Sequence, residues 1–218
     1  MANIVRDLSI RGAGEGDKKH KVIEAVETLE SILKIEPLNK DKLKEICSVI
    51  EAECDIDLAR RCLASTKNAY NWLYDALQKV QTDNDALLSV LKALCALCNG
   101  QPDVLDMRGT LFLPELLSKP ELSKECVATL VKLINYLCIM HEHNRQGFVD
   151  KGIIKALMKT FETYSDDKSI VMAVCSALRS LTLDDDVRVP FGKAHEHAKM
   201  IVTEANALKV ILKISKGK

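Results

Sequence analysis

The chain has 218 residues, of which 47% are hydrophobic, with 31 basic and 31 acidic side chains and a formal net charge of zero. This length allows one sizeable core. The balanced charge provides no general field to attract nucleic acid or an anionic membrane, so we expect neither as a partner. Apolar runs fall well short of the roughly 20 residues needed to cross a bilayer.

The cysteines indicate a reducing compartment. They follow no extracellular disulfide spacing and no apolar N-terminal signal precedes them, so we expect free thiols in a cytoplasmic protein with a nuclear share. Cys95 and Cys98 form a C-x-x-C motif inside an apolar helical run, where packing explains them better than thiol chemistry. The eight are Cys47, Cys54, Cys62, Cys95, Cys98, Cys126, Cys138 and Cys175.

The first elements in chain order are a flexible leader and two helices. Residues 1 to 18 contain Gly12, Gly14 and Gly16 and too little apolar surface to pack. From residue 19 to 56, apolar side chains recur at offsets of three and four, which is typical of amphipathic helices, and Pro37 separates two such runs. We interpret these helices as an N-terminal cap.

After the predicted cap, the sequence pattern repeats with a long period. The segments 87 to 95, 130 to 138 and 174 to 182 superpose at offsets of 43 and 44, and their apolar positions coincide. Each is apolar nearly all round, so each is expected to be buried on most sides. The coinciding core positions are Leu91, Ile134 and Leu178, and likewise Leu94, Leu137 and Leu181.

Turn residues give a second marker of the repeat. Asn68, Gly109, Gly152 and Asn206 each follow a short segment and precede a helical run, at spacings of 41, 43 and 54. Gly and Asn tolerate the left-handed backbone that ends a helix. The first two spacings match the roughly 40 to 47 residues of armadillo and HEAT repeats. We expect Pro114 near the start of a second helix.

These patterns predict an all-α, right-handed α-solenoid of three-helix armadillo-type repeats in one continuous domain. About three repeats occupy residues 57 to 183, and residues 184 to 218 form a partial fourth with an insertion or a lengthened first helix. The apolar face of Leu208, Ile211 and Leu212 then lacks a third helix. We therefore expect a fragment of a longer array.

Three stretches of the chain resemble the armadillo repeat family: NGQPDVLD at 99 to 106, HEHNRQGFVDKG at 141 to 152, and LDDDVRVPFGKAHEHAKMIV at 183 to 202. The resemblance runs from about residue 45 to the end. It implies an array that continues further and a non-enzymatic interaction protein, and it supplies neither a partner nor site residues.

Polar interruptions of the buried segments are the main candidate site. They recur three residues apart, hence on one face, and such a strip would line a concave groove. An extended partner segment would bind there through its backbone, with the cations favouring acidic side chains. The alternative is that any exposed strip must be polar for solubility. The strip comprises Ser89, Lys92, Lys132, Asn135, Ser176 and Arg179.

Nuclear-import adaptors also use an armadillo groove, lined by repeated Trp and Asn. The sole tryptophan, Trp72, follows a turn on a second helix, and Asn135 is the one asparagine in the strip. Lys92 and Arg179 would also repel a lysine-rich signal, so this function is disfavoured.

Asp184, Asp185 and Asp186 are a secondary candidate, because an acidic run can hold a basic partner. The competing interpretation is that they cap the helix that follows, with Arg188 as an ionic neighbour.

Metal and enzymatic roles are disfavoured. His141 and His143, like His195 and His197, are two residues apart, which does not place both on one helical face. No nucleophile with its base and no phosphate loop is present. We therefore expect no cofactor and no bound metal.

The function predicted is a non-enzymatic, monomeric module that binds a protein or peptide along its groove. The alternative is a scaffold that assembles complexes through its convex face or C-terminal end, where end-to-end association would occur.

Overall fold

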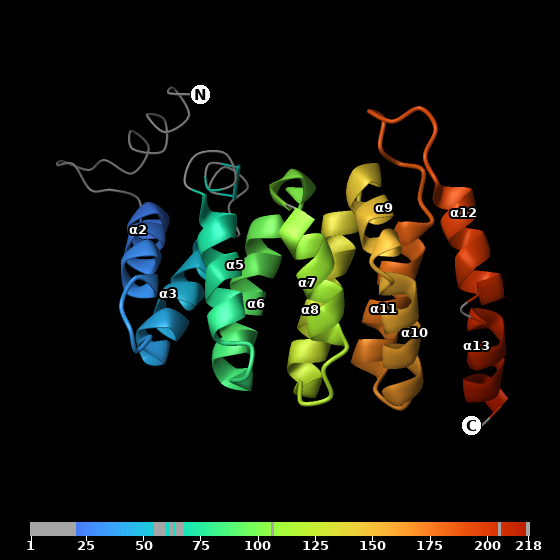
Figure 1. The fold of residues 1–218 in the computed structure, drawn as a ribbon, viewed down its shortest axis with the longest axis horizontal. Helices are drawn as coiled ribbons and strands as arrows, with labels where there is room; N and C mark the ends of the chain where they lie inside the picture. The colour runs from blue at the N-terminus through green and yellow to red at the C-terminus, as the bar shows by residue number, and fades with distance from the viewer. Residues whose placement is uncertain are drawn as a thin grey trace. The chain divides into compact units, whose positions relative to one another are not determined.

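The computed structural model describes residues 21–54, 60, 61, 63, 68–105, 107–204 and 206–216. Across these residues the chain is helical and contains no strand, which confirms the all-α prediction (Figure 1). The expected leader at 1–18 lies outside them. The chain forms two compact units, Met1–Val104 and Leu105–Lys218, which are considered separately.

The first unit is built from helices α2 (Lys21–Leu33), α3 (Lys40–Glu53), α5 (Ala69–Lys79) and α6 (Asn84–Cys98), followed by a 3-10 turn, η1 (Pro102–Val104). Helix α3 packs against α2 and α6, and α5 packs against α2 and α6. The predicted cap helices correspond to α2 and α3.

The second unit begins with α7 (Met107–Leu117), α8 (Lys124–Cys138), α9 (Glu142–Asp150), α10 (Ile153–Thr163) and α11 (Lys168–Leu181). After a non-helical connection it ends with α12 (Ala194–Lys199), a π-helical turn η2 (Met200–Glu204) and α13 (Ala207–Lys216). Helices α8 and α11 pack side by side, and α10 covers α11. The extra residues expected between 183 and 202 are thus a connection followed by α12.

The buried helices begin at equivalent N-caps. Asn39, Asp83, Ser123 and Asp167 precede α3, α6, α8 and α11, and each side chain accepts a hydrogen bond from a backbone N–H of the first turn. Such caps satisfy N–H groups that the helix itself leaves unpaired. Their spacings of 44, 40 and 44 repeat the sequence period at the start of each helix.

Three of the four predicted turn residues are in the left-handed region. The φ angles are 50° at Asn68, 80° at Gly152 and 51° at Asn206. The prediction for Gly109 is wrong, because this glycine lies inside α7.

The prediction for Pro114 is also wrong. It is an interior residue of α7 rather than one near its start, so this helix forgoes the backbone bond that residue 114 would donate to the Thr110 carbonyl. Helix α7 begins at Met107, only three residues after η1 ends, which leaves no room for a separate first helix and turn.

The predicted burial holds for two of the three apolar helices. Leu91 and Leu94 on α6 and Ile134 and Leu137 on α8 are at most 1% exposed. Helix α11 instead buries a single stripe, and its other face carries the exposed Met172 and Cys175. The reason is that α11 packs against α8, α10 and α12 but has no further helix against that face among the described residues.

Helix α13 leaves part of its predicted apolar face in solvent. Leu208 is 58% exposed and Leu212 is 46% exposed, while Ala207 and Val210 are buried. The side chain of Ile211, which the sequence groups with them, lies outside the described part.

Replacing Leu137 with Ala should lower the free energy of unfolding by about 2 to 5 kcal/mol, because the side chain is fully buried and its loss leaves a cavity. Chemical denaturation of the variant measures this cost. The exposed Leu208→Ala is the matched control and should change stability by less than about 0.5 kcal/mol. Equal effects would show that α8 is not a core helix.

Candidate functional site

The predicted polar strip is divided between the two units. Ser89 and Lys92 lie on α6 in the first unit, with Ser89 half-buried and Lys92 exposed. The second unit carries the other four, and three of these meet in one place: Lys132 and Asn135 of α8 and Ser176 of α11 line a common cavity. Arg179, also on α11, is exposed and does not line it.

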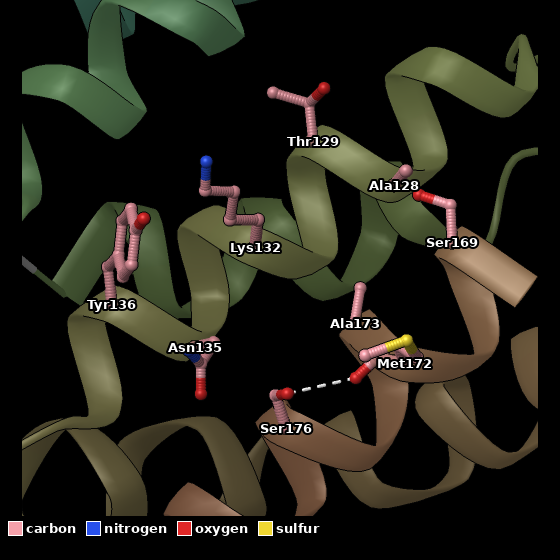
Figure 2. A pocket seen from close by; sticks show the side chains of 9 residues that line it. All are labelled: Ala128, Thr129, Lys132, Asn135, Tyr136, Ser169, Met172, Ala173 and Ser176. Atoms are coloured by element: carbon pink, nitrogen blue, oxygen red, sulfur yellow. Dashed lines mark hydrogen bonds between the residues drawn. The ribbon is translucent and has the colours of Figure 1, made fainter.

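The cavity lies between α8 and α11 and has a volume of about 420 Å³ (Figure 2). Its wall on α8 comprises Ala128, Thr129, Lys132, Asn135 and Tyr136, and its wall on α11 comprises Ser169, Met172, Ala173 and Ser176. A volume of this size is within the range of ligand sites. The lining combines small and apolar side chains with a few polar groups.

The side chains of Asn135 and Lys132 supply polar groups in this cavity that remain available to a ligand. The half-buried amide of Asn135 makes no hydrogen bond within the described part of the chain. The Lys132 ammonium lies 5.5 Å from the centre of the Tyr136 ring, a cation–π contact, and its N–H groups have no hydrogen-bond partner within the described residues. By contrast, the Ser176 hydroxyl donates to the Met172 carbonyl at 2.9 Å and offers only its acceptor positions (Figure 2).

Six lining residues lie outside the predicted strip: Ala128, Thr129, Tyr136, Ser169, Met172 and Ala173. A signal for them was present, because Thr129, Lys132 and Tyr136 follow the spacing i, i+3, i+7. Ser169, Met172 and Ser176 have the same spacing on α11. Side chains at these offsets lie on one helical face, so extending the strip by one turn on α8 and by two turns toward the start of α11 would have found them.

Two of the three carboxylates in the acidic run 184–186 accept hydrogen bonds from other residues of the second unit. Asp186 is 6% exposed, and its Oδ2 accepts the backbone N–H of Glu142 at 2.9 Å. Asp185 Oδ1 accepts the backbone N–H of Met140 at 3.2 Å. Of the three, Asp184 alone is exposed.

These contacts correct the capping interpretation. Asp185 and Asp186 serve the start of α9, about one repeat earlier in the sequence, whereas α12, the helix that follows them, has no side-chain cap. The packing of α11 against α8 brings the end of α11 close to the start of α9, which no local pattern encodes. Arg188 does pair with the run, because its Nε donates to Asp186 Oδ1 at 2.8 Å.

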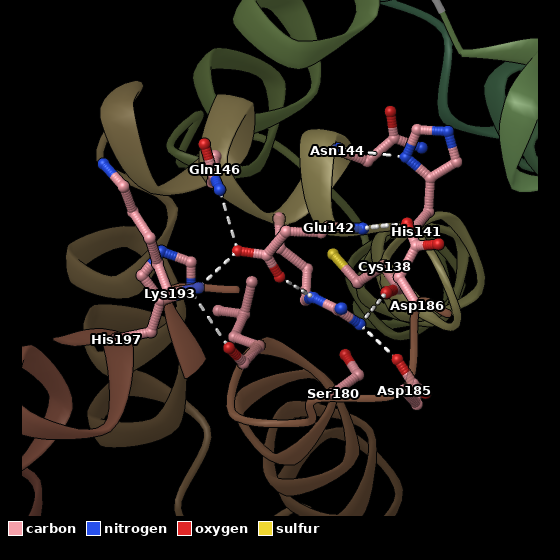
Figure 3. Close-up of polar contacts among 12 residues, drawn as sticks. Cys138, His141, Glu142, Asn144, Gln146, Ser180, Asp185, Asp186, Lys193 and His197 are labelled. Atoms are coloured by element: carbon pink, nitrogen blue, oxygen red, sulfur yellow. Dashed lines mark hydrogen bonds and ion pairs between the residues drawn. The ribbon is translucent and has the colours of Figure 1, made fainter. Parts of the chain in front are cut away.

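A buried ion pair joins this segment to α9 (Figure 3). Arg145 is fully buried; its Nε donates to Glu142 Oε2 at 2.9 Å, and its Nη1 donates to Asp185 Oδ1 at 2.5 Å and to the Cys138 carbonyl at 3.0 Å. Glu142 is 1% exposed and also accepts from Gln146 at 2.9 Å. The third hydrogen bond that Glu142 accepts comes from the backbone N–H of Lys193, at 2.6 Å. We call Glu142, Arg145, Asp185 and Asp186 the ionic clamp.

Two carboxylates of the clamp, Glu142 and Asp186, are held in their charged form. Burial favours the neutral form of Glu142, but the hydrogen bonds from Gln146, Lys193 and Arg145 outweigh it and lower its pKa below the usual 4.5. Hydrogen bonding from Arg188 lowers the pKa of Asp186 well below its usual 3.8.

One histidine of each pair, His141 and His197, makes a hydrogen-bonding contact within the fold. His141 is the N-cap of α9, and its Nδ1 accepts the backbone N–H of Asn144 at 3.1 Å. His197 is 2% exposed, with Nδ1 at 3.0 Å from the Leu181 carbonyl oxygen. No group of three His, Cys, Asp or Glu side chains suited to a metal ion occurs in the described ranges.

The described cysteines are free thiols, and all but Cys175 are buried. Burial raises the pKa of Cys47 and of Cys138 to about 12. Cys95 and Cys98 both lie in α6 as buried side chains, and burial raises the pKa of Cys98 well above 9.0. A thiol with a raised pKa is mostly protonated at neutral pH and is a poor nucleophile.

Acidification should destabilise the chain through the clamp. Glu142 and Asp186 have lower pKa values folded than their reference values of 4.5 and 3.8, so the unfolded chain binds more protons below about pH 5. Their contribution is complete above that pH and is lost as the pH falls through the folded values. Denaturant titrations from pH 7 to pH 3 should therefore give a falling free energy of unfolding below about pH 5.

The variant Asp186→Asn should have a shallower pH dependence and should lose about 1 to 3 kcal/mol at pH 7, because an amide replaces a charged acceptor. Asp184→Asn, at an exposed carboxylate with no hydrogen bond in the described part, is the control and should leave stability at pH 7 unchanged. An unchanged pH slope in Asp186→Asn would contradict the assigned role of this carboxylate.

No protein-family model matches the chain. Over 222 aligned residues, which cover all of the chain, it is 32% identical to armadillo repeat-containing protein 6 of Pongo abelii and of Homo sapiens. It is 31% identical over 208 residues, or 94% of the chain, to the armadillo repeat-containing protein 6 homolog of Drosophila melanogaster.

The chain spans 43% to 44% of the length of these relatives. Within the described residues, no helix has the length and apolar character needed to span a membrane. The repeated caps, the period and the sequence identity agree, and the chain is a homologue, along its whole length, of proteins named armadillo repeat-containing protein 6.

Proposed function

We propose that this chain is a non-enzymatic protein-interaction module that holds an extended partner segment in the groove between α8 and α11. The observation that carries the proposal is the cavity of about 420 Å³, whose lining includes an amide and an ammonium with no hydrogen-bond partner in the described part of the chain. The module would be one part of a right-handed armadillo solenoid and would act in the cytoplasm, with a nuclear share, as a monomer without a cofactor.

The chemistry of the cavity indicates what the segment would present. A primary amide both donates and accepts, so Asn135 can pair with an N–H and a C=O of an extended backbone. Lys132 adds one positive charge beside the Tyr136 ring, which favours an Asp or Glu side chain. Met172, which is 60% exposed, supplies an adaptable apolar contact.

The corresponding strip residues of the first unit, Ser89 and Lys92, are proposed to make similar contacts on α6. Arg179 is proposed to contact the partner beyond the cavity, as an exposed cation on the same helix as Ser176. The exposed Asp184 is the one member of the acidic run that could add a contact to a basic partner without breaking the clamp.

A second candidate is a scaffold that assembles complexes through the C-terminal helices. The observation in its favour is the exposure of Val202, Leu208 and Leu212, at 55%, 58% and 46%. Exposed apolar side chains favour burial against another surface.

The groove proposal can be tested with a phage-displayed library of random peptides selected on the purified chain. Selected peptides should be rich in Asp and Glu. Their affinity should fall about tenfold or more for Lys132→Glu combined with Asn135→Ala, because a charge-assisted hydrogen bond contributes about 1.5 to 3 kcal/mol. Fluorescence anisotropy with labelled peptides measures the change.

Lys155→Glu is the matched control, because Lys155 is an exposed lysine of α10 outside the cavity and gives the same charge change. It should leave the affinity unchanged. Denaturation curves of all variants should coincide with that of the wild type, since Lys132 is exposed and the Asn135 amide bonds to nothing in the described part. Equal loss in the control, or no loss in the double variant, would remove the groove as the site.

A further inference from the structure

The sequence contains a single Asn-Gly dipeptide, Asn99 and Gly100, directly after α6. Both residues are exposed, and neither lines the groove or belongs to the ionic clamp. The side-chain amide of Asn99 makes no hydrogen bond within the described part of the chain. No contact that the structure describes therefore protects this amide from reaction.

The two residues are the central pair of a type II β-turn. Asn99 has a φ of −63° and a ψ of 106°, and Gly100 has a φ of 74°. The Gln101 N–H donates to the Cys98 carbonyl at 3.0 Å and closes the turn. The Gly100 N–H donates to no group in the described ranges, and a Cβ at this glycine would meet nothing within 4 Å. The amide nitrogen of Gly100 is therefore neither hydrogen-bonded nor covered by a neighbouring side chain.

This pair of groups supports a reaction within the main chain. Once the Gly100 nitrogen loses its proton, it attacks Asn99 Cγ; the new C–N bond closes a five-membered succinimide, and ammonia leaves from the side chain. Water then adds to one of the two ring carbonyls. Opening at the main-chain carbonyl carbon gives isoaspartate, in which the chain runs through Cγ, whereas opening at Cγ gives aspartate. The net change is one water consumed and one ammonia released, so solvent supplies the only co-reactant.

The turn presents a small barrier to this reaction. Cyclisation requires the ψ angle of Asn99 to rotate away from 106°, which breaks the Gln101 bond that closes the turn. Gly100 accepts the change of backbone angles because it has no Cβ, and exposed turns open locally at a low free-energy cost. Asn135 provides the contrast. Its amide is also unpaired in the described part, but it lies inside α8, where the helix engages the N–H of the next residue.

We propose that the dipeptide is a self-modification site, at which the folded chain converts Asn99 into isoaspartate and aspartate without an enzyme. Each product places a carboxylate at the C-terminal end of α6, where the helix dipole is already negative. Isoaspartate also adds a methylene to the main chain between Cys98 and Gln101. Because Cys98 is fully buried, α6 is not free to shift, and the lengthened turn is expected to lose its closing bond.

The test is a time course of the purified, folded protein at mildly alkaline pH, where the Gly100 nitrogen loses its proton more readily. Digestion with a protease active at acidic pH, followed by mass spectrometry, measures replacement of the amide by a carboxyl group. A protein isoaspartate methyltransferase with labelled S-adenosylmethionine detects isoaspartate through its free α-carboxylate. We expect conversion of Asn99 to run well ahead of that of Asn135 and to slow at mildly acidic pH.

Asn99→Gln is the matched control for the chemistry. It keeps an uncharged amide at the same position, but cyclisation would form a six-membered ring, which closes more slowly. The methyl label on this peptide should therefore disappear.

The structural effect is measured on the isoaspartate form after chromatographic separation. Amide hydrogen exchange at Gln101 should be faster than in the unmodified protein, and the midpoint of thermal unfolding should fall by about 1 to 4 °C. Asn99→Asp adds the carboxylate without lengthening the main chain. It should keep the slow exchange at Gln101, which separates the effect of the charge from that of the extra methylene.

Four results would overturn the proposal. They are an unchanged Asn99 in the folded protein under conditions where the unfolded chain converts, conversion no faster than at Asn135, a methyl label that persists in Asn99→Gln, and unaltered exchange at Gln101 in the isoaspartate form.

Discussion

The fold depends on the need of its most buried helices for neighbours. Helices such as α8 are apolar on most sides, and no single repeat can cover them. Pairing α3 with α6 and α8 with α11 satisfies this need within each unit. Because packing occupies the other faces, the narrow polar strip is the part of α8 that remains available for binding, and it is where the cavity lies.

Ion pairs between residues that lie one repeat apart in the sequence reinforce this packing. Lys40 pairs with Asp83, and Lys79 pairs with Glu36, both across 43 residues of the first unit. In the second unit Lys124 lies near Asp167, also 43 residues away. Such exposed pairs contribute little stability individually, but each links a position to its equivalent in the next repeat and therefore opposes a shift of register.

The ionic clamp differs from these surface pairs because it is buried. Removing one partner would leave an unpaired charge in a nonpolar environment, which costs far more than breaking an exposed pair. It joins the start of α9 to the connection after α11, so the same charges fix both a helix end and this connection.

The sequence by itself determined the helical class, the period and most of the turn positions. The reason is that these features are local: apolar residues at offsets of three and four, and Asn or Gly where the backbone is left-handed. Two predictions from local signals were wrong: Gly109 was expected in a turn and Pro114 near a helix start, but both lie inside α7.

Only the tertiary structure decided how distant groups meet. It united Lys132, Asn135 and Ser176 around one cavity and left Arg179 outside. It also assigned Asp185 and Asp186 to a helix that begins more than 40 residues before them, although the sequence suggested the helix that follows. Hydrogen bonds and desolvation act between atoms in contact, and the packing of α11 on α8, not the order of the residues, creates those contacts.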